Sequence, residues 1–226
     1  ITYTDTDGTV LHISPGASGG FRMDVTRKNG TKMAYLADSS GRVTGVVDAA
    51  GRTTGYTWDD EGNMTSIRYP DGKSETYAYD SEGRVTRYTS RSGSTISYTY
   101  DQKGNLTQMA SSTGDVKSYT YDSDGYCTAI TENGETTTMS YTSQDGLARV
   151  TYPDGRYVAY TYDAQGRRTR LEGSDGYVAG YTYDGQGRLS SVTDGQNTLI
   201  QYTYDGEGKL IRQQNANGSY SQYGYA

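Results

Sequence analysis

The feature that most constrains this chain is an internal repeat of about 21 residues, marked by an aromatic residue followed by aspartate. The steps from Trp58 through Tyr79 and Tyr100 to Tyr121 are 21 residues each, and after a weaker copy centred on Tyr141 the same period resumes. A fixed period of this length is typical of a tandem array in which each repeat is one supersecondary unit. We therefore expect an extended repeat protein.

Each repeat carries a turn signature after a pair of aromatic residues. In one copy Tyr77 and Tyr79 are two residues apart, which places both rings on one face of a strand. Asp80 follows, and Gly83 comes three residues later; the aspartate accepts backbone N–H bonds and the glycine adopts a positive φ. The equivalent positions, which we expect to be structural, are Tyr56, Trp58, Asp59, Gly62, Tyr77, Tyr79, Asp80, Gly83, Tyr98, Tyr100, Asp101, Gly104, Tyr119, Tyr121, Asp122, Gly125, Tyr160, Tyr162, Asp163, Gly166, Tyr181, Tyr183, Asp184, Gly187, Tyr202, Tyr204, Asp205 and Gly208.

A second turn lies about ten residues beyond the first, and two turns per period define one β-hairpin. Its glycines are Gly51, Gly72, Gly93, Gly114, Gly155, Gly176 and Gly218. Consecutive hairpins joined in this way form an antiparallel meander. The sequence thus predicts an all-β fold, a strip of about nine antiparallel β-hairpin repeats, with no helix longer than about two turns because no apolar period near 3.6 residues is sustained.

The run that leaves the first turn has two apolar positions whose spacing does not fit a regular strand. Ile67 lies five residues past Gly62, and Met64 lies two past it. A separation of three puts them on opposite faces, so either Met64 tucks under the turn or a bulge intervenes. The later apolar position recurs on the same spacing, except in the weak copy, where Val150 comes one residue early and indicates a lost residue.

Composition excludes several classes of protein. The apolar fraction is 32%, with 25 tyrosines against 1 phenylalanine and 1 tryptophan, so a conventional oily core is not expected. The net charge of −6 is spread along the chain, without the basic patch that recruits nucleic acid or anionic lipid. No window has the apolar length of a signal peptide or a transmembrane helix, and the strand-like start at Ile1 suggests a piece of something longer.

No residue set predicts a catalytic, cofactor or metal site. His12 is the single histidine and Cys127 the single thiol, so a zinc site or a Cys–His pair would have to join the leader to the middle of the array. The repeated aspartates hold equivalent positions, whereas catalytic carboxylates need distinct environments. Asp5-Thr6-Asp7-Gly8 and Asp122-Ser123-Asp124-Gly125 resemble fragments of calcium loops but lack the remaining ligands.

The tyrosines allow two interpretations. In the structural one, Tyr-x-Tyr pairs from successive hairpins form ladders in which each ring packs on its counterpart. In the functional one, exposed rings bind sugars, since choline-binding and clostridial toxin repeats are also aromatic and about 20 residues long. Those families rely on tryptophan cages, and this chain has only Trp58, so we favour the ladder.

The array is less regular at its start. Residues 1–33 contain Pro15, Gly16, Gly19 and Gly20, which interrupt the pattern. We interpret residues 1–33 as a degenerate leading repeat with a Gly/Pro loop and residues 34–226 as the tandem repeats.

The run Tyr77-Ala78-Tyr79-Asp80-Ser81-Glu82-Gly83-Arg84 resembles the YD repeat of Rhs proteins, toxin-complex cocoons and teneurins. The resemblance implies a non-catalytic shell segment of a large secreted or cell-surface protein, bacterial in origin, whose partners are flanking repeats and an encapsulated C-terminal toxin of the same polypeptide. The Asp-Pro-x-Gly-Leu segment that releases the toxin in bacterial members is missing here, which places cleavage and toxicity outside this chain. The alternative is an extracellular glycan- or cell-wall-binding adhesion module.

Overall fold

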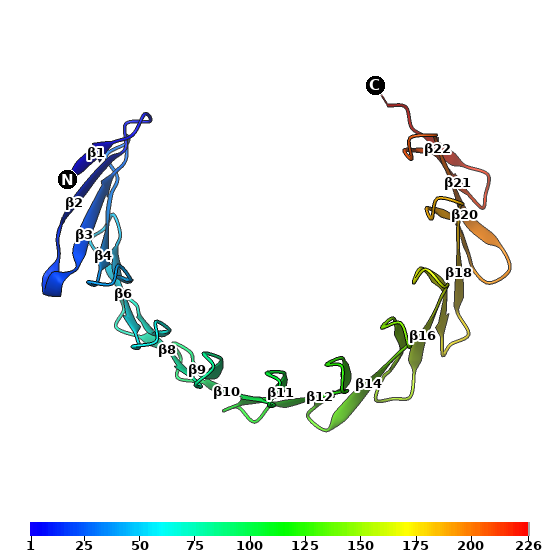
Figure 1. The fold of residues 1–226 in the computed structure, drawn as a ribbon, viewed down its shortest axis with the longest axis horizontal. Coiled ribbons are helices and arrows are strands. Elements are labelled where there is room, and N and C mark those ends of the chain that lie inside the picture. The colour runs from blue at the N-terminus through cyan, green and yellow to red at the C-terminus, as the bar shows by residue number, and fades with distance from the viewer. Residues whose placement is uncertain (226) are drawn as a thin grey trace. The chain divides into compact units, whose positions relative to one another are not determined.

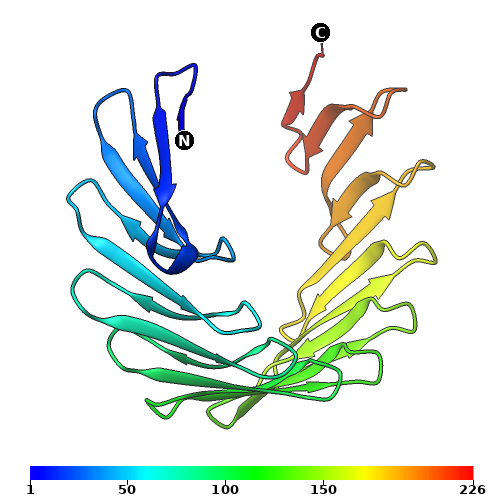
Figure 2. The same ribbon diagram turned by 60° about the vertical axis from the view of Figure 1, so that its left-hand side comes forward.

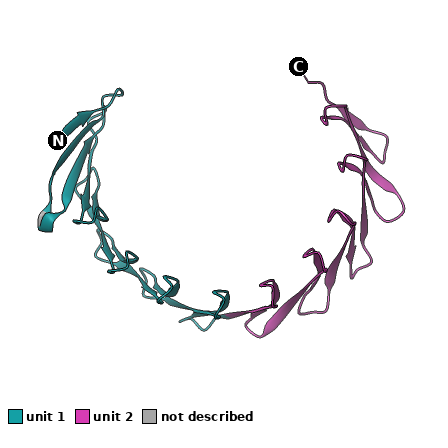
Figure 3. Cartoon of the chain, viewed as in Figure 1, with its two compact units in different colours: residues 1–116 teal, residues 117–226 magenta. Residues whose placement is uncertain are grey.

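The computed structural model describes residues 1–225 and is almost wholly β, as the turn spacing predicts. It contains 22 strands and one short 3-10 turn, Ala17–Gly19. None of the helical segments in the described part of the chain is long and apolar enough to cross a membrane. The chain divides into two compact units, Ile1–Val116 and Lys117–Ala226, which are coloured separately in Figure 3.

The first unit contains the strands from β1 to β11, labelled where there is room in Figure 1. Their bounds are β1 Thr2–Thr4, β2 Val10–Pro15, β3 Phe21–Thr26, β4 Lys32–Ala37, β5 Val43–Val47, β6 Thr53–Trp58, β7 Met64–Arg68, β8 Ser74–Tyr79, β9 Val85–Thr89, β10 Thr95–Tyr100 and β11 Leu106–Ser111.

The second unit contains β13 to β22 and all but the first residue of β12. The bounds are β12 Val116–Tyr121, β13 Cys127–Glu132, β14 Glu135–Tyr141, β15 Leu147–Thr151, β16 Tyr157–Tyr162, β17 Arg168–Gly173, β18 Val178–Tyr183, β19 Leu189–Thr193, β20 Thr198–Tyr204, β21 Leu210–Asn215 and β22 Tyr220–Gln222.

Within each unit every strand pairs antiparallel with the next strand in the sequence, so each unit is a meander of hairpins. In the first unit this holds from β1–β2 to β10–β11. In the second it holds from β12–β13 to β21–β22. Figure 2 shows the hairpins of both units with their turns at the two ends of the strands.

The two turns of a repeat share one backbone geometry. In the turn that follows the aromatic pair, which we name the aspartate turn, the N–H of Gly83 donates to the carbonyl of Asp80 at 3.1 Å. In the turn at the other strand end, the distal turn, the N–H of Gly72 donates to the carbonyl of Tyr69 at 2.9 Å. Both glycines have positive φ, 77° and 83°, a conformation that costs a side-chain-bearing residue about 1–2 kcal/mol. The predicted turns are confirmed.

A bulge explains the spacing of three between the two apolar positions. Along β6 and β7, Tyr56 lies opposite Ile67, whereas Trp58 lies opposite Met64, with a register shift between Thr57 and Trp58. One extra residue of β7 therefore stands between Met64 and the regular ladder, and Met64 returns to the face of the aromatic pair. The same shift recurs in the aspartate hairpins that follow.

The weak copy is one residue shorter than the other repeats. The missing residue was expected between the aspartate turn and Val150, but the structure places the loss elsewhere. Asp145, at φ 63°, occupies the left-handed position that glycine holds elsewhere, so Val150 keeps its distance of five residues from that position. The residue is missing in the preceding distal turn, where Asn133 and Gly134 form a two-residue turn with φ values of 50° and 91°. The prediction of a loss after the aspartate turn is therefore wrong, because aspartate tolerates the left-handed conformation.

The two faces of the hairpins differ in chemistry. The face that carries the anchor and its preceding aromatic is half-buried, as at Tyr98 and Tyr100, and we name it the aromatic face. The residue between them, Thr99, points to the opposite face and is exposed, as are its equivalents in the other repeats. Among residues 1–225 the buried apolar side chains are Ala34, Ala37 and Ala179, so the sheet is one layer without an oily core.

The leading segment joins the meander of its unit. Its turn at Asp5 repeats the aspartate-turn backbone, with the N–H of Gly8 donating to the carbonyl of Asp5 at 3.0 Å. Pro15 ends β2, and the loop to β3 closes with a bond from the N–H of Gly16 to the carbonyl of Gly20 at 2.9 Å. The division into residues 1–33 and 34–226 stays a prediction.

Candidate functional site: the contacts between repeats

Within each unit, neighbouring repeats are tied together by anchor aromatics, the residues at the position that precedes the turn aspartate in most copies. The hydroxyl of Tyr100 donates to the carbonyl oxygen of Val85, the first residue after the preceding aspartate turn in strand β9, at 2.8 Å. Trp58 does the same with its indole N–H, which donates to the carbonyl of Val43 at 2.8 Å. The equivalent bonds join Tyr79 to Met64, Tyr141 to Cys127, Tyr162 to Leu147, Tyr183 to Arg168, Tyr204 to Leu189 and Tyr225 to Leu210.

These acceptors lie at the bulge. The bulge breaks the regular exchange of hydrogen bonds along the ladder, so a carbonyl there needs another donor. The phenol supplies it from 15 residues further along the chain in most copies, for example Tyr162 to Leu147 at 2.9 Å. The tyrosine thus packs its ring on the sheet and also donates a hydrogen bond to a backbone carbonyl. Phenylalanine lacks the hydroxyl, which explains why it does not replace tyrosine at this position.

The turn aspartate holds its own loop closed. One oxygen of Asp80 accepts the N–H groups of Glu82 at 3.1 Å and Arg84 at 2.9 Å, and the other accepts Nε of Arg84 at 2.7 Å. The side chain of Arg84 is 29% exposed, so the ion pair is partly shielded. Asp38, Asp163 and Asp184 make the same three kinds of contact with their arginines.

The arginine reaches from its own turn to the following repeat. The guanidinium of Arg84 lies 4.8 Å from the centre of the Tyr100 ring, and that of Arg188 lies 4.5 Å from the Tyr204 ring. Arg188 also donates to the carbonyl of Asp205 at 3.3 Å. A cation over a ring face contributes about 0.5–1 kcal/mol at an exposed site. The basic residues beside the turns are therefore links between repeats.

The expected ladder of ring on equivalent ring is wrong. Ring pairs form at Tyr77–Tyr88 and Tyr126–Tyr141, with centres 5.3 and 4.9 Å apart, and neither pair joins equivalent positions. Arginine–ring and hydroxyl–carbonyl contacts link successive repeats at this position. Sequence periodicity shows that equivalent rings recur but not what lies between them.

One carboxylate sits among tyrosines on the aromatic face of the first unit. The hydroxyl of Tyr77 donates to Oε2 of Glu75 at 3.2 Å. Burial, followed by this bond and the charge of Glu75, raises the pKa of Tyr77 to about 12. Burial, followed by the charge of Glu75, raises the pKa of Tyr69 and of Tyr88. This cluster was not predicted from the sequence, although Glu75 lies two residues before the pair Tyr77 and Tyr79.

The structure places the single histidine and the single thiol in separate surroundings. His12 Nδ1 lies 3.0 Å from the hydroxyl of Thr2. The half-buried thiol of Cys127 donates to the carbonyl of Ala129 at 3.5 Å, and its own carbonyl accepts the Tyr141 hydroxyl. Residues 1–225 hold no group of three or more His, Cys, Asp or Glu side chains suited to a metal ion. That the chain needs no cofactor stays a prediction.

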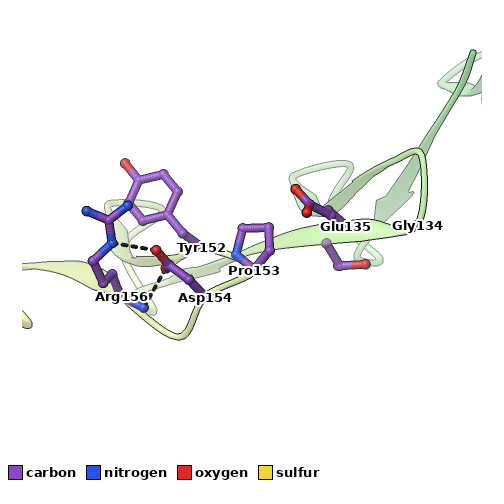
Figure 4. Close-up of a pocket in the computed structure, with 7 residues that line it drawn as sticks. Gly134, Glu135, Tyr152, Pro153, Asp154 and Arg156 are labelled. Carbon is purple, nitrogen blue, oxygen red and sulfur yellow. Dashed lines mark hydrogen bonds and ion pairs between the residues drawn. The ribbon is translucent and has the colours of Figure 1, made fainter.

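A hollow beside the distal turns of the second unit was not predicted. Figure 4 shows residues that line it: Tyr152, Pro153, Asp154 and Arg156 of one distal turn, and Glu135 beside the short turn at Gly134. The signals in the sequence are Asn133-Gly134, which is typical of a two-residue hairpin turn, and Pro153-Asp154-Gly155. The anchor bonds and arginine–ring contacts described above do not involve the residues that line this hollow.

Solved structures show the same fold. The chain aligns over 100% of its length, at 14% identity, with the structure of TcdB2-TccC3 without its hypervariable C-terminal region, with a TM-score of 0.59. The TcdB2-TccC3-Cdc42 structure gives 0.58 and the Photorhabdus luminescens Tc holotoxin pore 0.57, again over 100% of the chain at 14% identity. The chain spans 15% of the first structure, 16% of the second and 15% of the third.

Family models agree with the fold. No curated protein matches the chain. The model described as RHS Repeat matches residues 38–74. The model described as Teneurin YD-shell matches residues 76–226, more than half of the sequence. The chain therefore belongs to the Teneurin YD-shell family.

Proposed function

We propose that this chain is a non-catalytic wall segment of a large secreted or cell-surface protein of bacterial origin, and that the wall encloses a C-terminal toxin domain of the same polypeptide. The observation that carries the proposal is the recurring bond, within each unit, from an anchor aromatic to the backbone of the preceding repeat, as from Tyr100 to Val85. Such bonds stabilise a sheet by nearest-neighbour contacts, without a core.

The burial pattern supports a wall. Only alanines are buried among the apolar residues of the described chain, and no second layer covers either face. A globular domain of this length would bury large side chains in a shared core. Here the aromatic face stays half-buried, as at Tyr98, and is available to border an interior. Flanking repeats of the same polypeptide are the natural partners of a repeat array.

The similar structures support the enclosed partner. The first two are complexes of TcdB2 with TccC3, and the third is a Tc holotoxin pore. Their identity to this chain is 14%, so the likeness itself concerns the fold. The transfer of an enclosed toxin and of a secreted or surface location to this protein is our proposal.

Protease protection of the full-length protein tests the proposed function. We expect the region that follows the repeats to resist a protease while the wall is intact. We expect it to become sensitive when Tyr162, Tyr183 and Tyr204 are all changed to Phe, which removes three inter-repeat bonds. The matched control changes Tyr160, Tyr181 and Tyr202 to Phe. Cleavage of the following region at the same rapid rate in the wild-type protein and both variants would contradict an enclosing wall.

A further inference from the structure

The distal turn Tyr152–Arg156 forms a ridge in the second unit, and the repeat contacts leave it open. The preceding distal turn is the two-residue turn Asn133-Gly134, and beside it lies the hollow of Figure 4. A second hollow on the same ridge is bordered by Asp175 of the next distal turn. Tyr152 and Arg156 line both hollows. The ridge thus has a hollow on each side. Glu135, beside the short turn, borders one hollow, and Asp175 borders the other.

The ridge is held in one shape. The N–H of Gly155 donates to the carbonyl of Tyr152 at 2.9 Å, and the N–H of Tyr152 donates to the carbonyl of Arg156 at 2.8 Å. One oxygen of Asp154 accepts the N–H of Arg156 at 3.0 Å, and the other accepts its guanidinium. A turn whose backbone is already fixed loses less conformational entropy on binding than a flexible loop.

The exposed groups combine an aromatic ring with hydrogen-bonding groups of both kinds. Tyr152 is 45% exposed, so much of its ring is open to solvent. The carboxylates of Glu135 and Asp175 accept hydrogen bonds, and the guanidinium of Arg156, whose side chain is 77% exposed, donates them. An apolar ring face beside acceptors and donors complements a ligand that has one C–H face and a rim of hydroxyl groups.

We propose that the Tyr152 ridge is a carbohydrate site that takes pyranose units of a glycan chain. One sugar ring stacks on Tyr152, its hydroxyls donate to Glu135 or Asp175 and accept from Arg156, and the second hollow takes the adjoining unit. A basic peptide fits less well, because Arg156 already neutralises Asp154 and exposed carboxylates in high dielectric give weak ion pairs. The site lies on distal turns and does not rest on the shell function.

Titration of the full-length protein with chitotriose and with cellotriose tests the site. These two trisaccharides differ in the acetamido group, so they separate recognition of an amino sugar from recognition of any pyranose. We expect saturable binding of at least one, with saturation transferred from tyrosine protons to sugar C–H protons in difference NMR spectra. Binding near about 1 mM corresponds to about 4 kcal/mol, as expected for one shallow site.

Variants locate the binding. Tyr152→Ala should weaken binding by about tenfold or more, since it removes the stacking ring, whereas Tyr152→Phe should stay within about twofold because the ring remains. Glu135→Gln should weaken binding by a smaller factor. The matched control is Tyr220→Ala, a tyrosine 58% exposed in β22 that lines neither hollow, and it should leave binding unchanged. Circular dichroism establishes that each variant is folded.

Three results would overturn the site. The first is that neither trisaccharide binds at about 10 mM, a concentration that would populate even a weak site. The second is binding that Tyr220→Ala weakens as much as Tyr152→Ala. The third is that tetralysine binds in a salt-sensitive manner while both trisaccharides fail, which would make the ridge an electrostatic site for basic peptides.

Discussion

Arg84 is held by Asp80 of its own turn at 2.7 Å and lies over the ring of Tyr100 in the following repeat at 4.8 Å. One side chain therefore closes a turn and contacts the neighbour. The anchor bond from Tyr100 runs back across the same boundary to Val85. Adjacent repeats are thus linked in both directions, so removal of one group should disturb two repeats.

The turn aspartate gives the first prediction. Asp80→Ala should lower the melting temperature by about 2–4 °C, because three donors lose their acceptor and Arg84 loses its orientation. Asp80→Asn keeps an acceptor oxygen and should have a smaller effect. The control is Asp60→Ala, an exposed carboxylate within the equivalent turn of the preceding repeat, for which we expect no measurable change in a thermal melt. An equal shift in melting temperature for Asp60→Ala would contradict the stabilising role of the Asp80 carboxylate.

Backbone conformation at the turn glycine gives the second prediction. Gly166 has a φ of 77°, and no other atom lies within 4 Å of where an alanine Cβ would stand. Gly166→Ala should therefore lower the free energy of unfolding by about 1–2 kcal/mol through the left-handed conformation alone. Gly185 also has open space but lacks a positive φ, so Gly185→Ala should be neutral or slightly stabilising. Urea unfolding of both variants separates the effects. Equal free energies of unfolding would show that the turn glycine is replaceable.

Acid should weaken the fold through the turn carboxylates. The backbone N–H of Arg188 lowers the pKa of Asp184 below its usual 3.8, with desolvation opposing the shift. The side chain of Asn105 does the same for Asp101. Because the folded pKa is depressed, the stabilisation is fully present above about 3.8 and is lost as the pH falls through the lower folded value. Urea melts of Asp184→Asn should show a weaker dependence on pH below 4 than the wild-type protein; an unchanged slope would contradict this.

Alkali should act through the half-buried phenols. Burial and then the bond to Glu75 raise the pKa of Tyr77 from 10.0 to about 12. Since the unfolded phenol ionises first, the stabilisation is present below pH 10 and is lost as the pH rises toward 12. We expect Tyr77→Phe to move alkaline unfolding to higher pH, as followed by phenolate absorbance and circular dichroism. The same midpoint pH of alkaline unfolding in the variant and the wild-type protein would contradict a raised pKa for Tyr77.

The sequence predicts the hairpins and turns because both depend on local chemistry. Asp80 and Gly83 favour one turn geometry wherever the chain places them. The link between Tyr100 and Val85 was not predicted, since a period shows that positions recur without showing which backbone group a hydroxyl meets. The sequence placed the lost residue after the aspartate turn instead of in the short turn at Asn133, because Asp145 takes the left-handed conformation that glycine adopts in other repeats. Side-chain neighbours across repeats depend on sheet geometry, which periodicity alone does not specify.

The most direct test of the interlocked repeats compares two triple substitutions in the second unit. Changing Tyr162, Tyr183 and Tyr204 to Phe removes three anchor hydroxyls, each bonded to a carbonyl of the preceding repeat at 2.7–2.9 Å. Changing Tyr160, Tyr181 and Tyr202 to Phe removes three hydroxyls from the neighbouring aromatic position two residues earlier, on the same face of the strands.

The free energy of unfolding in urea is the quantity to measure. We expect the anchor variant to lose about 2–4 kcal/mol, because each bond contributes about 1 kcal/mol and the carbonyl left behind lacks a donor, while the neighbouring variant loses less than about 1 kcal/mol. Equal losses in the two variants, or no loss in the anchor variant, would contradict the claim that anchor hydroxyls hold the repeats together.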